Sequence, residues 1–551
     1  MAQLTFRTTF FITAASAISL APLSLQAEDK APFTFDVPSM VEQSVKAGIS
    51  HSYQGPWEYF VGGGAAGFDC NGDRMPDVVI AGGKQPAQLF INRSRPKGNL
   101  AFEKAPLDIG RSDLKVTGAY PINIDNDAYM DLVLLRVGPN QVLKGGPDCS
   151  FTKFNTSLAL EAGKDWTTGF SAIWENGNQY PTMAFGNYVD REAPGSPWGT
   201  CSPNLLMRPN VDNTYSTPIM LEPGYCSLSM MFTDWNKSGE PSLRITNDRQ
   251  YYRGGQEQLW QISEGQEPRA YGQNDGWETL KIWGMGIAEA DLNGDGFPEY
   301  ALTSMGDTKI QSLDEESDEE TPLYRDVAFE KNATAHRPYT GDDLRPSTGW
   351  HSQFADFNND ARSDLFIAKG NVEAMADFAN FDPDNMLLGG LDGQFWEKGD
   401  EAGIALKTHG RGAIVEDFNA DGMLDLLVVN RKTNINLFLN EGAKTDWGTR
   451  PMGNWVKIEL DNGDINRNAI GAKISVKTGN LNQNKTIQIG GGHASGQIGF
   501  THFGLGVAER ATIRVQWPNG DWSHPYKVFA NNHVVIKRDK NIANYWYPVK
   551  D

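Results

Sequence analysis

A nine-residue pattern rich in Asp, Asn and Gly recurs along the chain at near-regular intervals, and this repeat constrains the fold more than any other feature. Five copies are well formed, and they begin at Asp69, Asn123, Asp291, Asp356 and Asp417. Two weaker copies begin at Trp174, which keeps only the turn and its proline, and at Asp234, which has lost two carboxylates. We number these segments in chain order as the first to the seventh repeat loop: residues 69–77, 123–131, 174–182, 234–242, 291–299, 356–364 and 417–425.

The spacing of the repeat loops sets the size of the structural unit. Successive loops begin 54, 51, 60, 57, 65 and 61 residues apart, which is room for about four strands of five or six residues with their turns. The flanking segments are short apolar runs, such as Ala413–Val415 before and Leu426–Val429 after the seventh loop, and they read as strands. The sequence therefore predicts an all-β fold, with a seven-bladed β-propeller over the repeat region.

The residue types in each loop indicate a metal site. Positions 1, 3, 5 and 9 carry side-chain oxygens, and position 7 offers a backbone carbonyl. Calcium takes six to eight oxygens, whereas zinc favours His and Cys and magnesium resists a largely dehydrated carboxylate cage. Without an ion the crowded carboxylates repel one another, so we expect empty loops to fray. About five calcium sites are predicted.

The predicted ligands share these positions in the five well-formed loops. They are Asp69, Asn71, Asp73, Met75 and Asp77; Asn123, Asp125, Asp127, Tyr129 and Asp131; Asp291, Asn293, Asp295, Phe297 and Glu299; Asp356, Asn358, Asp360, Arg362 and Asp364; and Asp417, Asn419, Asp421, Met423 and Asp425.

Two simpler explanations of the pattern compete with calcium binding. Asp, Asn and Gly make good turns between strands, but five copies in phase with a repeat exceed what turn formation requires. An EF-hand begins in the same way but needs a Glu at position 12. Position 12 is apolar in every well-formed loop: Ile80, Leu134, Leu302, Ile367 and Val428.

The loops and the strands after them resemble the FG-GAP/VCBS repeat family, whose members carry calcium-binding hairpins. Leu89–Asn92 and Leu437–Asn440 resemble a second landmark of that family, a strand with the pattern Leu-Phe-x-Asn. The resemblance implies a calcium-binding propeller over residues 28–452. The eroded third and fourth loops put metal binding in doubt there, and the acidic insertion 314–320 is most simply a solvated loop.

The C-terminal segment resembles the ASPIC/UnbV domain over residues 453–541. The matching segments, in order, are 454–460, 466–472, 490–492, 502–506 and 515–520. A propeller with this domain resembles the cartilage acidic protein-like family of exported proteins. The resemblance implies an extracytoplasmic, calcium-binding protein: a seven-bladed β-propeller with calcium-binding hairpin loops, followed by a small β-rich C-terminal domain. It implies no established catalytic activity.

The N-terminal residues 1–27 have the order of a secretory signal peptide. Arg7 precedes the apolar stretch Phe10–Leu20, and small residues allow cleavage near Ala27. A membrane anchor is the alternative, but the stretch is shorter than the ~20 apolar residues that span a bilayer. We expect a secreted or periplasmic protein with no membrane insertion after cleavage.

The charge balance limits the partners. With 49 Lys and Arg against 69 Asp and Glu, the net charge of the 551 residues is −20. Such a chain repels nucleic-acid phosphates and anionic lipid, so binding to nucleic acid is excluded as a function class. Cations are the natural partners.

The four cysteines fit an oxidising compartment. Cys201 and Cys226 would close a short local loop, and we expect them to pair. For Cys70 two alternatives stay open: a buried free thiol or a disulfide with Cys149.

Motifs for catalysis are weak. The Gly62–Gly67 segment has dinucleotide-binding spacing but leads into a strand and not a helix. No HExxH, GxSxG or CxxC motif occurs. His493 with Ser495 is a remote candidate pair, more simply explained as turn or strand residues.

Two function classes follow from the sequence. The favoured one is a non-catalytic module that presents loops to an unidentified extracellular protein or glycan. The alternative is a polysaccharide-active hydrolase, lyase or dehydratase whose site lies on one face or in the central channel. Three tryptophans would suit sugar stacking, although each is more simply explained by packing: Trp57, Trp198 and Trp350.

Overall fold

The computed structural model describes residues 35–175, 177–193, 200–215, 217–248, 255–318, 320–334, 347–370 and 382–548. The predicted signal peptide lies outside these ranges, as do Asn176 of the third repeat loop, Trp198, and Glu319 of the acidic insertion. The other residues of the acidic insertion are exposed or half-buried, as a solvated loop requires.

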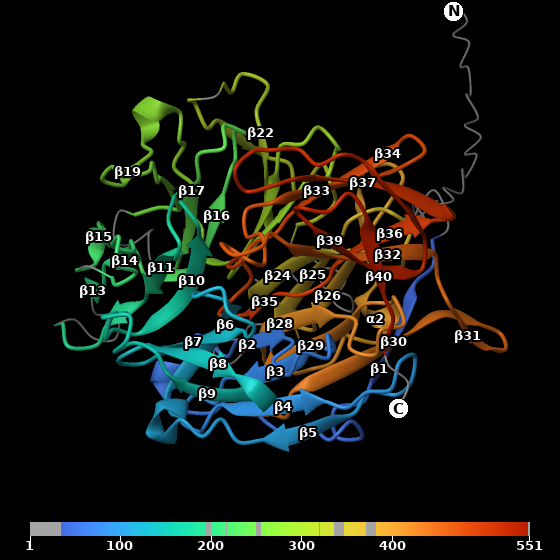
Figure 1. Ribbon diagram of the computed structural model, residues 1–551, viewed down its shortest axis with the longest axis horizontal. Coiled ribbons are helices and arrows are strands. Elements are labelled where there is room, and N and C mark those ends of the chain that lie inside the picture. The colour runs from blue at the N-terminus through green and yellow to red at the C-terminus, as the bar shows by residue number, and fades with distance from the viewer. Residues whose placement is uncertain are drawn as a thin grey trace, which may run out of the picture. The chain divides into compact units, whose positions relative to one another are not determined.

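Seven sheets, each built on four antiparallel strands, follow one another along the described part of the chain (Figure 1). Sheet 1 contains β2 (Ala65–Phe68), β3 (Asp77–Ile80), β4 (Gln88–Asn92) and β5 (Phe102–Ala105). Sheet 2 contains β6 (Val116–Ile122), β7 (Asp131–Arg136), β8 (Gln141–Gly146) and β9 (Ser150–Lys153). Sheet 3 contains β10 (Thr167–Ile173), β11 (Thr182–Asn187), β14 (Asn204–Met207) and β15 (Ile219–Leu221), and a ribbon of β12 (Val189–Asp190) and β13 (Thr200–Cys201) extends from it.

The remaining sheets repeat this order. Sheet 4 contains β16 (Ser227–Thr233), β17 (Ser242–Asn247), β18 (Gln258–Gln261) and β19 (Arg269–Ala270). Sheet 5 contains β20 (Gly284–Ala290), β21 (Glu299–Ser304), β22 (Lys309–Leu313) and β23 (Tyr324–Asp326). Sheet 6 contains β24 (Gly349–Ala355), β25 (Asp364–Lys369), β26 (Asn385–Gly389) and β27 (Phe395–Glu397). Sheet 7 contains β28 (Gly410–Glu416), β29 (Asp425–Asn430), β30 (Asn436–Thr445) and β1 (Pro38–Glu42), with β31 (Gly448–Arg450) on β30.

The first strands of the sheets pack against one another in a closed order: β2, β6, β10, β16, β20, β24, β28 and again β2. Sheet 7 takes three strands from the end of this region and its outer strand, β1, from the beginning. The prediction of an all-β fold is therefore confirmed, and the seven sheets form a β-propeller-like ring. The single described α-helix, α2 (Gly399–Ala402), is one short turn between sheets 6 and 7.

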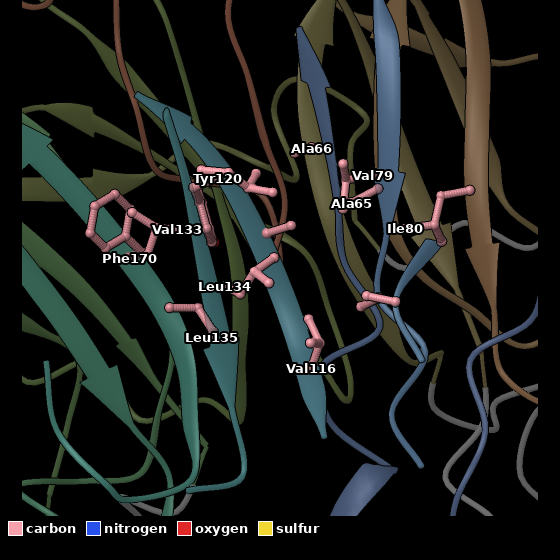
Figure 2. Close-up of a cluster of buried hydrophobic side chains, with 14 of the residues drawn as sticks. Ala65, Ala66, Val79, Ile80, Val116, Tyr120, Val133, Leu134, Leu135 and Phe170 are labelled. Carbon is pink, nitrogen blue, oxygen red and sulfur yellow. The ribbon is translucent and has the colours of Figure 1, made fainter. Parts of the chain in front are cut away.

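The core lies between neighbouring sheets. Figure 2 shows Val79 and Ile80 of sheet 1, Val133 to Leu135 of sheet 2 and Phe170 of sheet 3, all fully buried. Burying one such aliphatic or aromatic side chain contributes about 1.5–3 kcal/mol. The runs of three or four apolar residues after the five well-formed loops are buried because each sheet has a neighbour on either side.

The C-terminal residues form two further sheets with a separate core. One has the order β36 (Thr501–Gly506), β32 (Asn454–Asp461), β39 (Asn532–Lys537) and β40 (Ala543–Trp546). The other has the order β34 (Leu481–Thr486), β33 (Lys473–Thr478), β37 (Arg510–Gln516) and β38 (Tyr526–Phe529). Apolar residues such as Val456, Ile474 and Ile513 fill the space between them. We call residues 454–548 the C-terminal sandwich.

Two disulfides are present. Cys201 pairs with Cys226, as predicted, and Cys70 pairs with Cys149. The second pair settles the alternative that the sequence left open at Cys70. It joins the first repeat loop to the β8–β9 turn of sheet 2, so it links two neighbouring sheets.

Candidate metal centres at the repeat loops

Each repeat loop connects the first and second strands of one sheet, so all seven lie at the same end of the ring. Position 9 is the first residue of the second strand in every sheet, from Asp77 in β3 to Asp425 in β29. The sequence pattern therefore places the loops and the strands after them correctly.

The first repeat loop is held by a local network of hydrogen bonds. The Asp69 carboxylate accepts the backbone N–H groups of Gly72 at 2.7 Å and Arg74 at 2.8 Å. Asn71 Oδ1 accepts the N–H of Asp73 at 2.9 Å, and Asp73 Oδ1 accepts that of Met75 at 2.8 Å. Alternate side chains thus turn to the inside of the loop, as the calcium hypothesis requires.

The same network recurs in the fifth, sixth and seventh loops. In the seventh, Asp417 accepts the N–H groups of Asp421 at 3.0 Å and Gly422 at 2.9 Å. In the fifth, Asp291 accepts those of Gly294 at 2.7 Å and Gly296 at 2.9 Å. These backbone N–H donors offset part of the repulsion between the carboxylates. The expectation that empty loops fray considered the repulsion alone and did not include these hydrogen bonds.

The carboxylate at position 9 has a second role that the sequence reasoning missed. Asp425 Oδ2 accepts the N–H of Phe418 at 3.0 Å, and its Oδ1 accepts that of Asn440 in β30 at 2.9 Å. Asp77, Asp131 and Asp364 make the equivalent pairs of bonds in their own sheets: to Cys70 and Asn92, to Ile124 and Gly145, and to Phe357 and Gly389. Position 9 therefore ties its loop to the third strand of the sheet. The signal in the sequence was that this position keeps an acid in every well-formed loop.

Burial and mutual repulsion raise the pKa values of these carboxyl groups. Burial raises the pKa of Asp77 and of Asp131 to about 7. Burial and the neighbouring carboxylate of Asp360 raise the pKa of Asp356 to about 7. Burial and the neighbouring carboxylate of Asp417 raise the pKa of Asp421 to about 7. The pKa of Asp425 lies well above its usual value for the same two reasons. A bound cation would relieve both effects.

The donor set fits a hard cation, since the predicted ligands are all oxygens. In the second loop Asn123 Oδ1 is buried and has no hydrogen-bond partner, and such an orphaned acceptor suits a metal ligand. Within the described ranges, the one group of three Asp, Glu, His or Cys ligand atoms that all lie within 4.8 Å is Cys70, Asp77 and Cys149, whose sulfurs form a disulfide. The ligand assignments in the five well-formed loops stay predictions.

The C-terminal sandwich covers the repeat loops. Arg74 pairs with Glu459 at 2.7 Å, and Lys473 pairs with Asp234 at 2.8 Å. Other contacts reach the second, fifth and seventh loops: Arg467 N to Asn126 Oδ1 at 3.1 Å, Asn484 Nδ2 to Asp291 Oδ2 at 2.7 Å, and Lys457 Nζ to Asp417 Oδ2 at 3.6 Å. The candidate metal centres therefore lie between the ring and the sandwich, an arrangement that the sequence did not predict.

Residues 489–498, which we call the central segment, leave the sandwich and run through the middle of the ring. The segment includes β35 (Gly496–Gln497), which pairs with β2. Further bridges join Ile489 to β10, Gly490 to β16, Gly492 to β20 and Ser495 to β6. The central segment thus touches the first strands of five sheets and fills the centre of the ring.

His493 and Ser495, the remote catalytic candidates, belong to this segment and are buried. His493 Nε2 accepts the N–H of Gly62 at 3.1 Å, and Ser495 Oγ accepts that of Ala65 at 3.0 Å. Burial lowers the pKa of His493 to about 3 and that of His351, which accepts the His493 N–H, to about 4. Both histidines are neutral supports of the backbone at neutral pH.

The glycines around the central segment are required by close packing. A Cβ at Gly64 would lie 1.7 Å from Ala494 O, and one at Gly492, where φ is +52°, would lie 2.2 Å from His351 Cε1. The Gly62–Gly67 segment therefore serves to admit this second backbone, and it leads into strand β2, which contradicts a dinucleotide-binding role.

The tryptophans proposed for sugar stacking differ in exposure. Trp350 is fully buried and donates its indole N–H to Gly370 O at 2.8 Å. Trp57 is 39% exposed and packs against Phe60 and Trp166. Of the two that the structure describes, Trp57 alone keeps an accessible ring.

No helix in the described portion of the chain is long and apolar enough to cross a membrane.

Comparisons with known proteins support the C-terminal prediction. Residues 463–543 match the family model described as "ASPIC and UnbV". Cartilage acidic protein 1 from Mus musculus is 27% identical over 251 residues, which cover 43% of this chain and 34% of that protein. The Homo sapiens protein of the same name matches with the same identity over 33% of its length. The chain thus matches about a third of these curated relatives.

Among solved structures, BBS1N in complex with ARL6DN shares 10% sequence identity and a TM-score of 0.40, over 71% of this chain and 96% of that chain.

Proposed function

We propose that the protein is a calcium-binding, non-catalytic interaction module with a propeller-like ring, acting outside the cytoplasm. The observation that carries the calcium proposal is the recurrence of one oxygen-lined hydrogen-bonded network in the first, fifth, sixth and seventh repeat loops. The resemblance to FG-GAP/VCBS repeats and the similarity to cartilage acidic protein 1 point in the same direction.

Calcium would act where the ring meets the C-terminal sandwich. The carboxylates of the first, fifth, sixth and seventh repeat loops would hold the ions, and the ions would fix the loops that contact Glu459, Lys457 and Asn484. Extracellular calcium sites bind at about 10⁻⁴–10⁻³ M, and tenfold saturation of one site contributes about 1.4 kcal/mol. Several sites together would decide how firmly the sandwich is held.

The partner, an extracellular protein or glycan, would bind away from the covered loops. The repeat loops face the sandwich, whereas the opposite end of the ring carries the partly exposed Trp57. Two disulfides support an oxidising, secreted or periplasmic location.

A polysaccharide-active enzyme finds less support. The central channel that such a site would use is filled by the central segment. A cavity of about 280 Å³ lies beside that segment and is lined by Glu289, Glu416 and Lys485. These three side chains already have partners within the protein, which are Gln488, Lys457 and the backbone oxygen of His502 respectively.

Scanning calorimetry of the full chain in millimolar calcium and in excess chelator tests the calcium proposal. We expect a higher melting temperature with calcium, and equal melting temperatures would contradict the calcium proposal.

Protein and glycan arrays probed with the calcium-loaded chain, together with a reducing-sugar release assay, distinguish binding of a partner from enzymatic cleavage of a polysaccharide. Release of sugar at a catalytic rate would contradict the non-catalytic assignment.

A further inference from the structure

Lys144 in strand β8 binds two predicted ligands of the second repeat loop at once. Its Nζ lies 2.7 Å from Asp127 Oδ2 and also forms an ion pair with Asp125 Oδ2. These carboxylates are positions 5 and 3 of the loop. Among the ion pairs of the described residues, Lys144 is the one cation that contacts two predicted ligands of the same repeat loop.

The register of the sheets shows that this lysine is peculiar to sheet 2. Residue 143 pairs with position 10 of its loop, and the next residue, Lys144, points to the loop. The same register in sheets 1, 6 and 7 places aliphatic side chains at that position, and in sheet 5 a serine: Ile91, Leu388, Leu439 and Ser312. The other four well-formed loops therefore have no basic side chain at this position.

We propose that the ammonium group of Lys144 is the resident cation of the second repeat loop, in the place that calcium takes in the first, fifth, sixth and seventh loops. The chain then binds four calcium ions and not five. This inference rests on the proposed function, because it concerns which of the well-formed loops take calcium.

Charge explains why the two cations exclude each other. The carboxylates of Asp125 and Asp127 cannot coordinate a divalent ion while they hold an ammonium group, and the two positive charges would lie a few ångströms apart in a partly buried site. A lysine that is paired with two carboxylates and partly exposed is charged at neutral pH.

The third sheet offers an internal parallel. The same register position is Arg208, whose Nε lies 2.8 Å from the buried carboxylate of Glu175 in the third repeat loop. That loop has lost its acidic ligand positions. A basic side chain from the third strand can thus neutralise a repeat loop permanently.

Basic residues near other loops differ in their contacts. In the sixth loop, Arg362 pairs with Asp360 alone, at 2.6 Å, from within the loop itself. In the seventh, Lys457 lies 3.6 Å from Asp417 and equally far from Glu416, which is not a predicted ligand. Neither Arg362 nor Lys457 forms ion pairs with two predicted ligands of the same loop.

The ligand set of the second loop is otherwise complete. Asn123 Oδ1 is buried without a partner, and Asp131 holds the same two backbone N–H groups as its counterparts. Replacing Lys144 with the leucine found in sheets 6 and 7 should therefore open a calcium site.

The test compares the full-length wild type with Lys144→Leu, Lys144→Arg and the control Lys153→Leu, an exposed lysine on the adjacent strand β9. Bound calcium is counted by elemental analysis after equilibrium dialysis against millimolar calcium. We expect Lys144→Leu to bind one more calcium ion per chain than the wild type and both other variants. Equal, non-zero stoichiometry in all four proteins overturns the inference, whereas zero calcium in the folded wild type overturns the proposed function.

A second measurement does not depend on calcium. Hydrogen exchange in excess chelator reports the protection of the amides of residues 124–131. We expect these amides to exchange about tenfold faster in Lys144→Leu than in the wild type, because a charged hydrogen-bond donor has been removed, and the Lys153→Leu control to match the wild type. Unchanged protection in Lys144→Leu overturns the role of Lys144 even if no protein binds calcium.

Discussion

In the seventh repeat loop, burial raises the pKa of Asp421 and of Asp425, and the neighbouring carboxylate of Asp417 adds to the effect on both. In the second loop, Lys144 pairs with Asp125 and Asp127. The two loops occupy equivalent places in their sheets and share the position 9 bonds to the third strand. The comparison teaches that one backbone geometry can carry two electrostatic arrangements: in the second loop a lysine from the third strand pairs with the carboxylates, and in the seventh loop the third strand supplies no basic side chain.

The largest expected effect tests what the two loops share. Replacing Asp425 or Asp131 with Ala removes the acceptor of two buried backbone N–H groups, so each variant should lose about 2–5 kcal/mol of stability with or without calcium. Urea unfolding in chelator measures the loss, with the exposed Asp464→Ala as control. A loss of stability in the Asp425 variant but not in the Asp131 variant would contradict the structural equivalence of position 9 in the two loops.

A second prediction distinguishes carboxylates that are placed as calcium ligands from acidic residues that are merely exposed to solvent. The double change of Asp360 and Asp364 to Asn removes two predicted calcium ligands, and it should lower stability in millimolar calcium by about 2 kcal/mol. The same double change at Asp314 and Asp318 in the solvated insertion should have a smaller effect. Equal shifts in melting temperature would argue against ligand roles in the sixth loop.

A third prediction compares the two loops directly through calcium. Asp421→Ala should lose about 1.4 kcal/mol of the stabilisation that calcium provides, because one site is removed. Asp127→Ala should keep all of it, because its loop holds Lys144 instead. The difference in melting temperature between calcium and chelator measures each effect, and equal losses in both variants would contradict the comparison.

The smallest effect concerns pH in the absence of calcium. The pKa of Asp421 is about 7 in the folded chain, raised by burial and by Asp417, and that of an unfolded Asp is about 3.9. Between these values the folded state binds more protons, so stability in chelator should fall as pH rises, by about 1 kcal/mol between pH 5 and pH 6 for this group. Asp421→Asn should show a correspondingly weaker pH dependence in urea unfolding. An unchanged slope would show that Asp421 is ionised throughout.

The repeat determined much of the fold in advance. Loop spacing predicted seven four-stranded units, and apolar runs such as Leu426–Val429 marked the second strands, because strand length and burial depend on local sequence. The contacts of the C-terminal sandwich could not be predicted in the same way. Arg74 and Glu459, or Asn484 and Asp291, come together only through tertiary packing.

The candidate sites were predicted in part. The ligand positions and their turns followed from the pattern of oxygens, but the cation at the second loop did not, because Lys144 lies 13 residues beyond Asp131 on another strand. The register of β7 and β8 was needed to bring them together. The glycines of the central segment can be read from the sequence. The close approach of a second stretch of backbone, which those glycines permit, could not be predicted from it.

Strand β1 completes sheet 7 by pairing with β30, although the two stand at opposite ends of the ring region in the sequence. A ribosome that adds 5–20 residues per second needs roughly 20–80 s to make the chain between them. During that interval β1 has no strand to pair with, and an unpaired strand edge invites association with other chains. The newborn protein is thus most vulnerable to aggregation just before its last ring strand emerges, and a chaperone that shields β1 would be expected to raise its yield.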